Sequence, residues 1–236
     1  MRLGIMQPYF FPYLGYISLI KHVDKFILLD DVQFIRHGWI ERNRILKPNG
    51  GWQYISVPLK KHEQKTFIKD IEINNSLEWG KKILAQLEHY RKAPYYYEVI
   101  KMIQDIFGTP YVSITDLDKA ALDKIEHYLR IDTPIEVFRD MNLEIEQVCS
   151  ADEWALNICK AIPTADEYWN PPGGKEFFDV QKYQKNHINL YFQKIDLYKY
   201  PQKGNDFEPG LSIIDVMMFN SPEKINQMLD RYTLYE

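Results

Sequence analysis

The N-terminal apolar pattern restricts the fold of this chain more than any other feature of its sequence. Leu3–Met6 is a short apolar run typical of a buried strand, and Lys25–Asp31 is a second run that ends in two aspartates. Between them, Leu14, Ile17 and Ile20 recur at the spacing of one helix face. Strand, helix and strand within about thirty residues predict a βαβ unit, in which the two strands run parallel.

The rest of the chain extends this pattern. Trp52–Leu59 and Ile188–Ile195 have the pattern of further strands, while helical periodicity dominates residues 75–130. We therefore expect an α/β fold, in which the N-terminal βαβ unit belongs to a mainly parallel, Rossmann-like sheet with a helical middle section. At 236 residues the chain can bury one substantial core, so we predict a single α/β domain over residues 1–236, with 75–130 as a helical insertion or subdomain.

Composition argues against several classes of protein. Hydrophobic residues make up 45% and charged residues 26%, as in ordinary globular chains. The net charge is -4, and neither a basic face nor a basic tail argues for a nucleic-acid partner. No stretch approaches the roughly 20 apolar residues that span a bilayer, and Met1 leads almost directly into a strand rather than a signal peptide.

The two cysteines agree with this interpretation. Cys149 and Cys159 have no His or Cys beside them at metal-ligand spacing, which argues against a zinc site. We expect both to be buried free thiols, as in a reducing compartment. The sequence thus predicts a cytoplasmic protein without membrane insertion, without a nucleic-acid partner and without a metal site.

The loop after the first strand, QPYFFPYLGY, is richer than a strand-to-helix turn requires. Pro8 and Pro12 fix their own φ angles and disfavour helix at the preceding residues, so the loop is stiff before any ligand binds. Gly15 allows close backbone approach at the helix start, where unpaired N–H groups favour anions. Gln7 supplies an amide, and flat walls come from Tyr9, Phe10, Phe11, Tyr13 and Tyr16. We favour a ligand-binding wall over the alternative, an aromatic minicore that covers the strand end.

Asp30 and Asp31 follow a predicted buried strand, where one or both should emerge from the core. Paired carboxylates can bind a metal, hold an amine or hydroxyls, or act as a general base. Capping and turn formation, which Asp performs routinely, explain them equally well. His37 lies nearby and is the one histidine that we consider as an acid or base. The candidate catalytic residues are therefore Asp30, Asp31 and His37.

Arginines and a tryptophan alternate in the segment that follows. Arginine binds phosphate through two N–H groups and stacks on flat rings, so this pattern suits a nucleotide diphosphate better than a nucleic-acid duplex. Salt bridges to the aspartates, above all to Asp31, are the alternative. The candidate substrate-binding residues of this segment are Gln33, Arg36, Trp39, Arg42, Asn43 and Arg44.

Two later segments complete the candidate site. Pro171 to Gly174 form an irregular loop with bare backbone, across which Tyr168 and Asn170 can reach; taken alone, this motif is better explained as a simple turn. Asp215 lies within an apolar segment, so it must be paired or lie at an exposed edge, and a structural role is favoured over a catalytic one. The candidate binding residues added here are Tyr168, Asn170, Gly173, Gly174 and Asp215.

The order of these loops along the chain predicts where they lie. In open α/β sheets, ligands bind beyond the carboxyl ends of the strands. We therefore expect residues 7–16, 30–44 and 168–174 to meet at that edge of the sheet and to face a common cavity.

Four segments of the chain resemble one family. MQPYFFPYLGYISLI, DKFILLDDVQFIRHGWIERNRI, YWNPPGG and LSIIDVMMFNS occur in this order in WbqC-like proteins, and the resemblance covers almost the full length. The first two segments are the specific ones. Members of this family are encoded in bacterial clusters for O-antigen and other surface polysaccharides, and the resemblance implies a role in transferring glycine or another acyl group to a sugar. It carries no established catalytic residues onto this sequence.

The first segment is also similar to the opening of HxGH nucleotidylyltransferases, which have a strand, a proline-containing loop, a small residue and a helix. Tyr13 and Tyr16 occupy the positions of the two histidines. Tyrosine cannot supply the same cationic donors to a triphosphate, so this resemblance implies a shared architecture more than a shared chemistry.

We predict a transferase that acts on a nucleotide-activated amino sugar in surface-glycan synthesis, by N-acyl or glycyl transfer. Arg42 and Arg44 would hold the diphosphate, while Trp39 and the neighbouring tyrosines would stack on the base or sugar. Asp30 or Asp31 would accept a proton from the sugar amine. Gly173, Gly174 and Asn170 would close over the ligand or offer backbone donors to a developing oxyanion.

The alternatives differ in cofactors and partners. The transferase is expected to bind no cofactor tightly, and its acyl donor cannot be read from the sequence. A nucleotidylyltransferase-like enzyme would need Mg²⁺ and a nucleoside triphosphate. The third hypothesis is a non-catalytic protein that binds a nucleotide sugar or glycan, as a homo-oligomer or as a partner of a glycan-biosynthesis enzyme.

Overall fold

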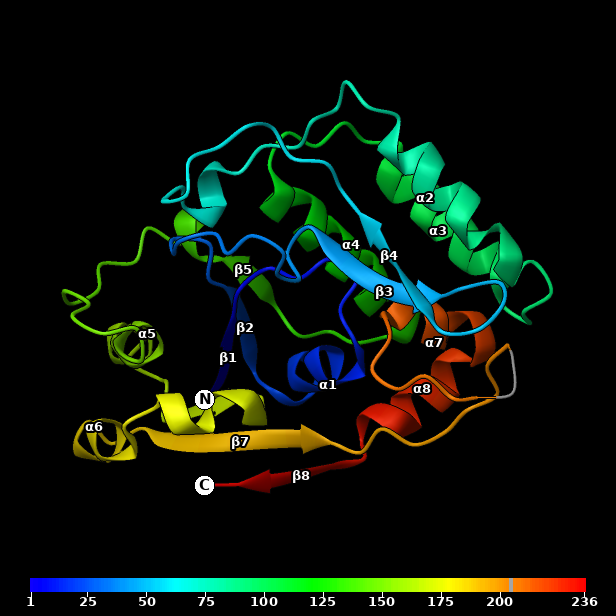
Figure 1. Ribbon diagram of the computed structural model, residues 1–236. Helices are drawn as coiled ribbons and strands as arrows, with labels where there is room; N and C mark the ends of the chain where they lie inside the picture. The colour runs from blue at the N-terminus through cyan, green and yellow to red at the C-terminus, as the bar shows by residue number, and fades with distance from the viewer. Residues whose placement is uncertain (204–205) are drawn as a thin grey trace.

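A six-stranded sheet forms the centre of the molecule in the computed structural model, which describes residues 1–203 and 206–236 (Figure 1). The strands lie in the order β5-β2-β1-β6-β7-β8. Neighbouring strands run parallel except for β7 and β8, which are antiparallel. Their bounds are β1 (Arg2–Met6), β2 (Lys25–Leu28), β5 (Ile135–Val137), β6 (Glu167–Asn170), β7 (Asn189–Ile195) and β8 (Tyr232–Tyr235).

A separate antiparallel hairpin consists of β3 (Arg42–Leu46) and β4 (Trp52–Ser56). The sequence predicted a loop as far as Arg44, so the start of β3 corrects that prediction. Asn43 is buried while Arg42 and Arg44 keep partial exposure, which is the alternation of a strand with one buried face. The long polar side chains on the exposed face concealed this strand in the sequence.

Helices cover both faces of the sheet, which gives a three-layer α/β arrangement (Figure 1). In β2, Phe26 and Leu28 belong to one hydrophobic cluster with α1, α4 and α8, whereas Ile27 and the following Leu29 belong to another with α5 and α6. The helix bounds are α1 (Leu14–His22), α2 (Trp79–Leu87), α3 (Tyr96–Phe107), α4 (Ile114–Leu129), α5 (Glu153–Ala161), α6 (Val180–Lys185), α7 (Ile213–Phe219) and α8 (Pro222–Leu229).

The predicted fold class is confirmed. β1 and β2 flank α1 and pair in parallel from Leu3–Lys25 to Met6–Leu28, which is the βαβ unit expected from the N-terminal pattern. The middle of the chain forms α2, α3 and α4, as its periodicity predicted. From β1 the sheet continues through β2 and β5 on one side and through β6 and β7 on the other. This reversal of strand order places a topological switch point between β1 and β6, where open α/β sheets bind their ligands.

Two further expectations can be compared with the structure. Within residues 1–203 and 206–236, no helix combines the length and the apolar character needed to cross a membrane. Cys159 is a buried free thiol, as expected, but Cys149 is exposed. The reason is that Cys149 lies in the irregular segment before α5, whereas Cys159 lies on the buried face of that helix.

Asp118 is an exception among the buried residues of α4. Its side chain has no exposed surface, and neither carboxylate oxygen has a hydrogen-bond partner in the described part of the chain. Burial raises the pKa of Asp118 well above its usual range, and the nearby Glu41 carboxylate raises it further. The folded state therefore favours the protonated, neutral form of this side chain.

This burial predicts a pH-dependent gain in stability for Asp118→Asn. Because the pKa of Asp118 is higher in the folded state, the native protein binds more protons, and its stability falls as the pH rises above about 4. The variant lacks this loss, so it should be more stable than the wild type by about 1–3 kcal/mol at pH 8 and nearly equal to it near pH 4. Urea denaturation at both pH values measures this difference. Asp123→Asn, at an exposed position of the same helix, is the matched control; an equal effect of both substitutions would contradict the prediction.

Candidate functional site

A cavity of about 610 Å³ lies at the switch point, beyond the carboxyl ends of β1, β2 and β6. Segments after all three strands contribute to its lining, as expected for ligand sites in such sheets. The predicted binding residues that line it are Gln7, Gln33, Tyr168, Asn170, Gly173 and Gly174. The structure thus brings together part of each of the three predicted loops.

The polar floor of the cavity is held in place by hydrogen bonds. The Tyr168 hydroxyl donates to Asn170 Oδ1 at 2.9 Å, and Asn170 Nδ2 donates to the carbonyl oxygen of Pro171 at 2.9 Å. Gly174 leaves the space that Asn170 occupies, because a Cβ at position 174 would lie 2.5 Å from Asn170 Nδ2. These contacts fix the Asn170 carboxamide before any ligand binds.

Two glutamine side chains supply further amide groups. Gln33 Nε2 donates to the carbonyl oxygen of Gln64 at 2.9 Å, and the backbone of Gln33 forms an antiparallel bridge with Phe67. The backbone oxygen of Gln7 accepts a 2.8 Å hydrogen bond from the Tyr16 hydroxyl. The Gln7 carboxamide has no partner among the described residues, so its donors and its acceptor are available to a ligand.

Among the described residues that line the cavity, Tyr168 is the one with an ionisable side chain. Burial raises the pKa of Tyr168, so this hydroxyl is neutral and acts as a hydrogen-bond group. The remaining walls are apolar or aromatic, with the largest rings supplied by Phe67, Trp154, Phe177 and Phe178. A cavity with this lining suits an uncharged group that offers flat or apolar faces and a few hydrogen-bond atoms.

The two aspartates after β2 have different surroundings. Asp30 has no exposed surface; its carboxylate accepts hydrogen bonds from the Arg139 side chain at 3.1 Å and the Arg139 backbone at 3.3 Å. Burial raises the pKa of Asp30, and the Arg139 guanidinium opposes that rise. Asp31 is partly exposed and pairs with Lys69 at 2.5 Å. Neither aspartate is part of the cavity lining, although Leu29 and Val32 on either side of the pair are. Of the two, Asp31 is the one whose side chain solvent and ligands can reach.

The other predicted ring and arginine positions form a packed cluster that does not line this cavity. The Tyr9 and Trp39 rings stack at 5.8 Å, and the Arg44 guanidinium lies 5.4 Å from Trp39 and 5.2 Å from Trp52. Arg44 Nη2 also donates to the carbonyl oxygen of Gly210 at 3.2 Å. Arg42 lies 4.2 Å from the Tyr54 ring. These guanidinium groups pack on rings and bind backbone oxygens.

The proline-rich loop is anchored by a buried asparagine. Asn43 Nδ2 donates to the carbonyl oxygens of Phe10 and Phe11, at 3.2 and 2.6 Å. Phe11 has a positive φ of 42, a strained conformation for this residue, and the Ser212 hydroxyl also holds its carbonyl oxygen at 2.7 Å. Asn43 therefore does not line the cavity. It holds in place the loop whose first residue, Gln7, does line it.

Tyr13, Tyr16 and Gly15 belong to the same packed region. Tyr16 is fully buried, whereas Tyr13 keeps partial exposure. A Cβ at Gly15 would lie 2.5 Å from the Tyr13 ring, so the glycine makes room for that ring. The start of α1 is thus covered by an aromatic side chain.

Three predicted residues remain. Arg36 lies in an adjoining groove of about 420 Å³, which shares Gln33 with the cavity. His37 is exposed and has a positive φ of 61. Asp215 has no exposed surface and accepts hydrogen bonds from Tyr90 and Tyr200, both at 2.6 Å.

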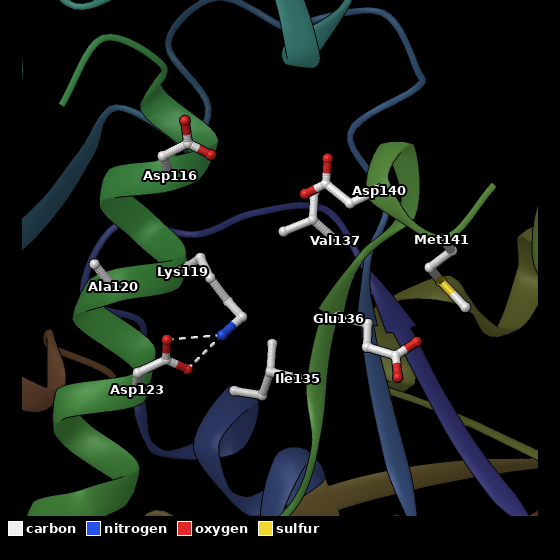
Figure 2. Close-up of a pocket in the computed structure, with 9 residues that line it drawn as sticks. All are labelled: Asp116, Lys119, Ala120, Asp123, Ile135, Glu136, Val137, Asp140 and Met141. Carbon is white, nitrogen blue, oxygen red and sulfur yellow. Dashed lines mark hydrogen bonds and ion pairs between the residues drawn. The ribbon is translucent and has the colours of Figure 1, made fainter.

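A second cavity of about 470 Å³ lies between α4 and the edge strand β5 (Figure 2). Its carboxylates are paired: Asp123 with Lys119 at 2.6 Å, Glu136 with Lys25 at 2.9 Å, and the other two with Arg139. Within the described ranges, no group of three or more His, Cys, Asp or Glu side chains is placed to hold a metal. All four carboxylates that line this cavity therefore have a cationic partner.

Sequence reasoning missed several aromatic residues of the main cavity. Phe177 and Phe178 directly follow the predicted glycine loop, so their proximity along the chain was a usable signal. Trp154 comes from the first turn of α5, and Phe67 reaches the cavity through its bridge with Gln33. Nothing in the local sequence indicates those two contacts.

Comparisons with known proteins place this chain in a family. The model of the WbqC-like protein family matches residues 7–227. The chain belongs to this family. This WbqC-like protein is 30% identical over 225 residues to the uncharacterized protein Rv1507c of Mycobacterium tuberculosis (strain ATCC 25618 / H37Rv), with 93% of each chain covered. No solved structure matches it.

The two neighbouring glycines of this WbqC-like protein should differ in their tolerance of alanine. Gly174→Ala places a Cβ against Asn170 Nδ2 and 2.9 Å from the Phe178 ring, so the cavity floor must shift, at a cost of about 1–3 kcal/mol. Gly173→Ala meets no atom within 4 Å and should change stability by less than about 0.5 kcal/mol. Urea denaturation measures both, and equal stabilities would contradict the tight contact at position 174.

Asp215→Ala should show that this residue supports the core. The substitution removes the acceptor of the Tyr90 and Tyr200 hydroxyls, so we expect a loss of about 2–4 kcal/mol in the free energy of unfolding. Asp105→Ala, at an exposed position of α3, is the control and should lie within about 0.5 kcal/mol of the wild type. A loss below about 1 kcal/mol for Asp215→Ala would contradict a structural role.

Proposed function

We propose that this WbqC-like protein is a transferase that acts on a nucleotide-activated amino sugar in O-antigen or other bacterial surface-glycan synthesis. The observation that carries the proposal is the uncharged, aromatic- and amide-lined cavity at the switch point between β1 and β6. Family membership supports the same direction, because the resemblance drawn from the sequence implies acyl or glycyl transfer to a sugar.

The lining chemistry suits a nucleoside or sugar. Aromatic side chains such as Trp154 and Phe178 offer apolar faces against which a base or a sugar ring can pack. The carboxamides of Gln7, Gln33 and Asn170 each combine an acceptor with donors, which match hydroxyl groups and base edges. Together these groups bind a polar but uncharged ring system better than a free acid or a simple hydrocarbon.

Asp31 is the proposed general base. In the reaction the sugar amine nitrogen attacks the carbonyl carbon of an activated acyl or aminoacyl donor, and a C–N bond forms while the bond from that carbon to the donor's leaving group breaks. The amine proton passes to the Asp31 carboxylate, which requires hydrogen-bond reach between the two groups. Lys69 holds this carboxylate at 2.5 Å, so the ion pair must loosen when substrate binds.

A thermal-shift screen with a blocked cavity tests the proposal. Nucleotide amino sugars should raise the melting temperature, because ligand at 100 times its dissociation constant adds about 2.7 kcal/mol of stability. Ala151 is exposed and lines the cavity, so Ala151→Phe should fill the space and abolish the shift without disturbing the core. Ala85→Phe, at an exposed position of α2 away from the cavity, should keep it.

The response to other ligands distinguishes the alternative functions. A shift with nucleoside triphosphates and Mg²⁺, together with pyrophosphate release, would replace the transferase by a nucleotidylyltransferase. Binding of a nucleotide sugar without turnover under acyl-CoA or aminoacyl donors would indicate a non-catalytic binding partner. A shift that survives in Ala151→Phe would place the ligand outside the cavity and overturn the proposed site.

A further inference from the structure

A groove opens beside the main cavity and shares a wall with it. The groove, of about 420 Å³, is lined by Phe34, Ile35, Arg36, Gln64 and Gln33, and the last of these also lines the cavity. The two hollows together can accommodate one extended ligand that passes over the Gln33 side chain. Only the groove carries a permanently charged side chain, that of Arg36.

The Arg36 guanidinium has donors to spare. It is exposed, and its Nη2 donates to the carbonyl oxygen of His62 at 3.1 Å. Among the described residues, Arg36 makes no ion pair with a carboxylate. An arginine presents five N–H donors, so most of those of Arg36 are available to a ligand. By contrast, Arg44 is held between two tryptophan rings and away from the cavity.

Gln64, which lines the groove, belongs to a basic segment. Residues 60–69, KKHEQKTFIK, contain four lysines and one glutamate, although the whole chain has a net charge of -4. Phe34 N donates to the carbonyl oxygen of Thr66 at 2.9 Å, which together with the Gln33–Phe67 bridge fixes this segment beside the groove. Lys61 and Lys65 of this segment are exposed, with Glu63 between them, and neither lysine is part of the groove lining. Arg36 is therefore the cationic group of the groove lining, whereas the lining of the cavity is uncharged.

We propose that this groove is the diphosphate subsite, with Arg36 as its principal ligand-binding residue. That the ligand is a nucleotide sugar rests on the proposed function. The new element is the place where its diphosphate binds, beside Arg36. The nucleoside or sugar enters the cavity and packs among its rings and amides, while the diphosphate remains at the rim. There Arg36 binds two phosphate oxygens, and Lys61 and Lys65 lower the repulsion between the phosphate charges. In this proposal Arg36 takes the phosphate-binding role that the sequence predicted for Arg42 and Arg44.

Isothermal titration calorimetry with diphosphates and their uncharged nucleosides tests the subsite. The probes are UDP, ADP, CDP, GDP and dTDP with the matching nucleosides. Arg36→Gln should weaken binding of the preferred diphosphate at least about tenfold and leave the nucleoside affinity within about twofold. Arg91→Gln, another exposed arginine, is the matched control and should change neither affinity.

Each outcome of these titrations supports or overturns the diphosphate subsite, whether or not the protein is a transferase. Loss of diphosphate affinity in Arg36→Gln supports the subsite even in a protein that shows no transferase turnover. An unchanged affinity in Arg36→Gln, or a loss in Arg44→Gln alone, overturns the subsite even where nucleotide sugars are substrates. Equal weakening of nucleoside and diphosphate by Arg36→Gln would show a general effect on the cavity and overturn it, and so would the absence of diphosphate binding.

Discussion

The parallel pairing of β1 with both of its neighbours determines where chemistry can occur in this molecule. Leu3 of β1 lies opposite Lys25 of β2 on one side and Tyr168 of β6 on the other, so all three strands end at one edge of the sheet. The chain leaves β1 and β6 toward opposite sides of the sheet, and the loops after these strands separate. The cavity lies between them, and its polar side chains come from the last of these strands, β6, and from the segments that follow β1 and β2.

The aromatic cluster and the cavity have different physical roles. The Tyr9 ring of the loop after β1 stacks on Trp39, the Phe11 ring packs on Phe107, and Asn43 of β3 holds the loop backbone through two hydrogen bonds. Because the loop is fixed at both its strand end and its carbonyl groups, its first residue, Gln7, is presented to the cavity in a defined position. The rings therefore support the loop that positions Gln7 without lining the cavity themselves. This packing role explains why so many of them are buried.

The periodicity of the sequence was sufficient to predict the βαβ unit, the helical middle and the edge of the sheet where the loops meet, because these depend on local patterns. The side chains that face the cavity were predicted less completely. The choice between Asp30 and Asp31 depends on Arg139, which lies more than a hundred residues away and fixes Asp30 in the interior. Phe67 reaches the cavity only through a bridge with Gln33. Contacts of this kind join distant segments, and neither composition nor spacing encodes them.

The separation of charge between interior and rim follows from the cost of burial. A guanidinium or ammonium group inside the cavity would lose its hydration without a fixed partner, at a high cost in free energy. Uncharged amides and rings cost less to bury. Charged contacts to a ligand are therefore expected where water still reaches them, and Arg36 and the exposed lysines of residues 60–69 lie in such a position. A ligand with one uncharged and one anionic end can bind in only one orientation under this arrangement. In the proposed orientation the uncharged end packs among the rings and amides of the cavity, and the anionic end stays at Arg36 in the groove, where solvent screens the charges of both groups.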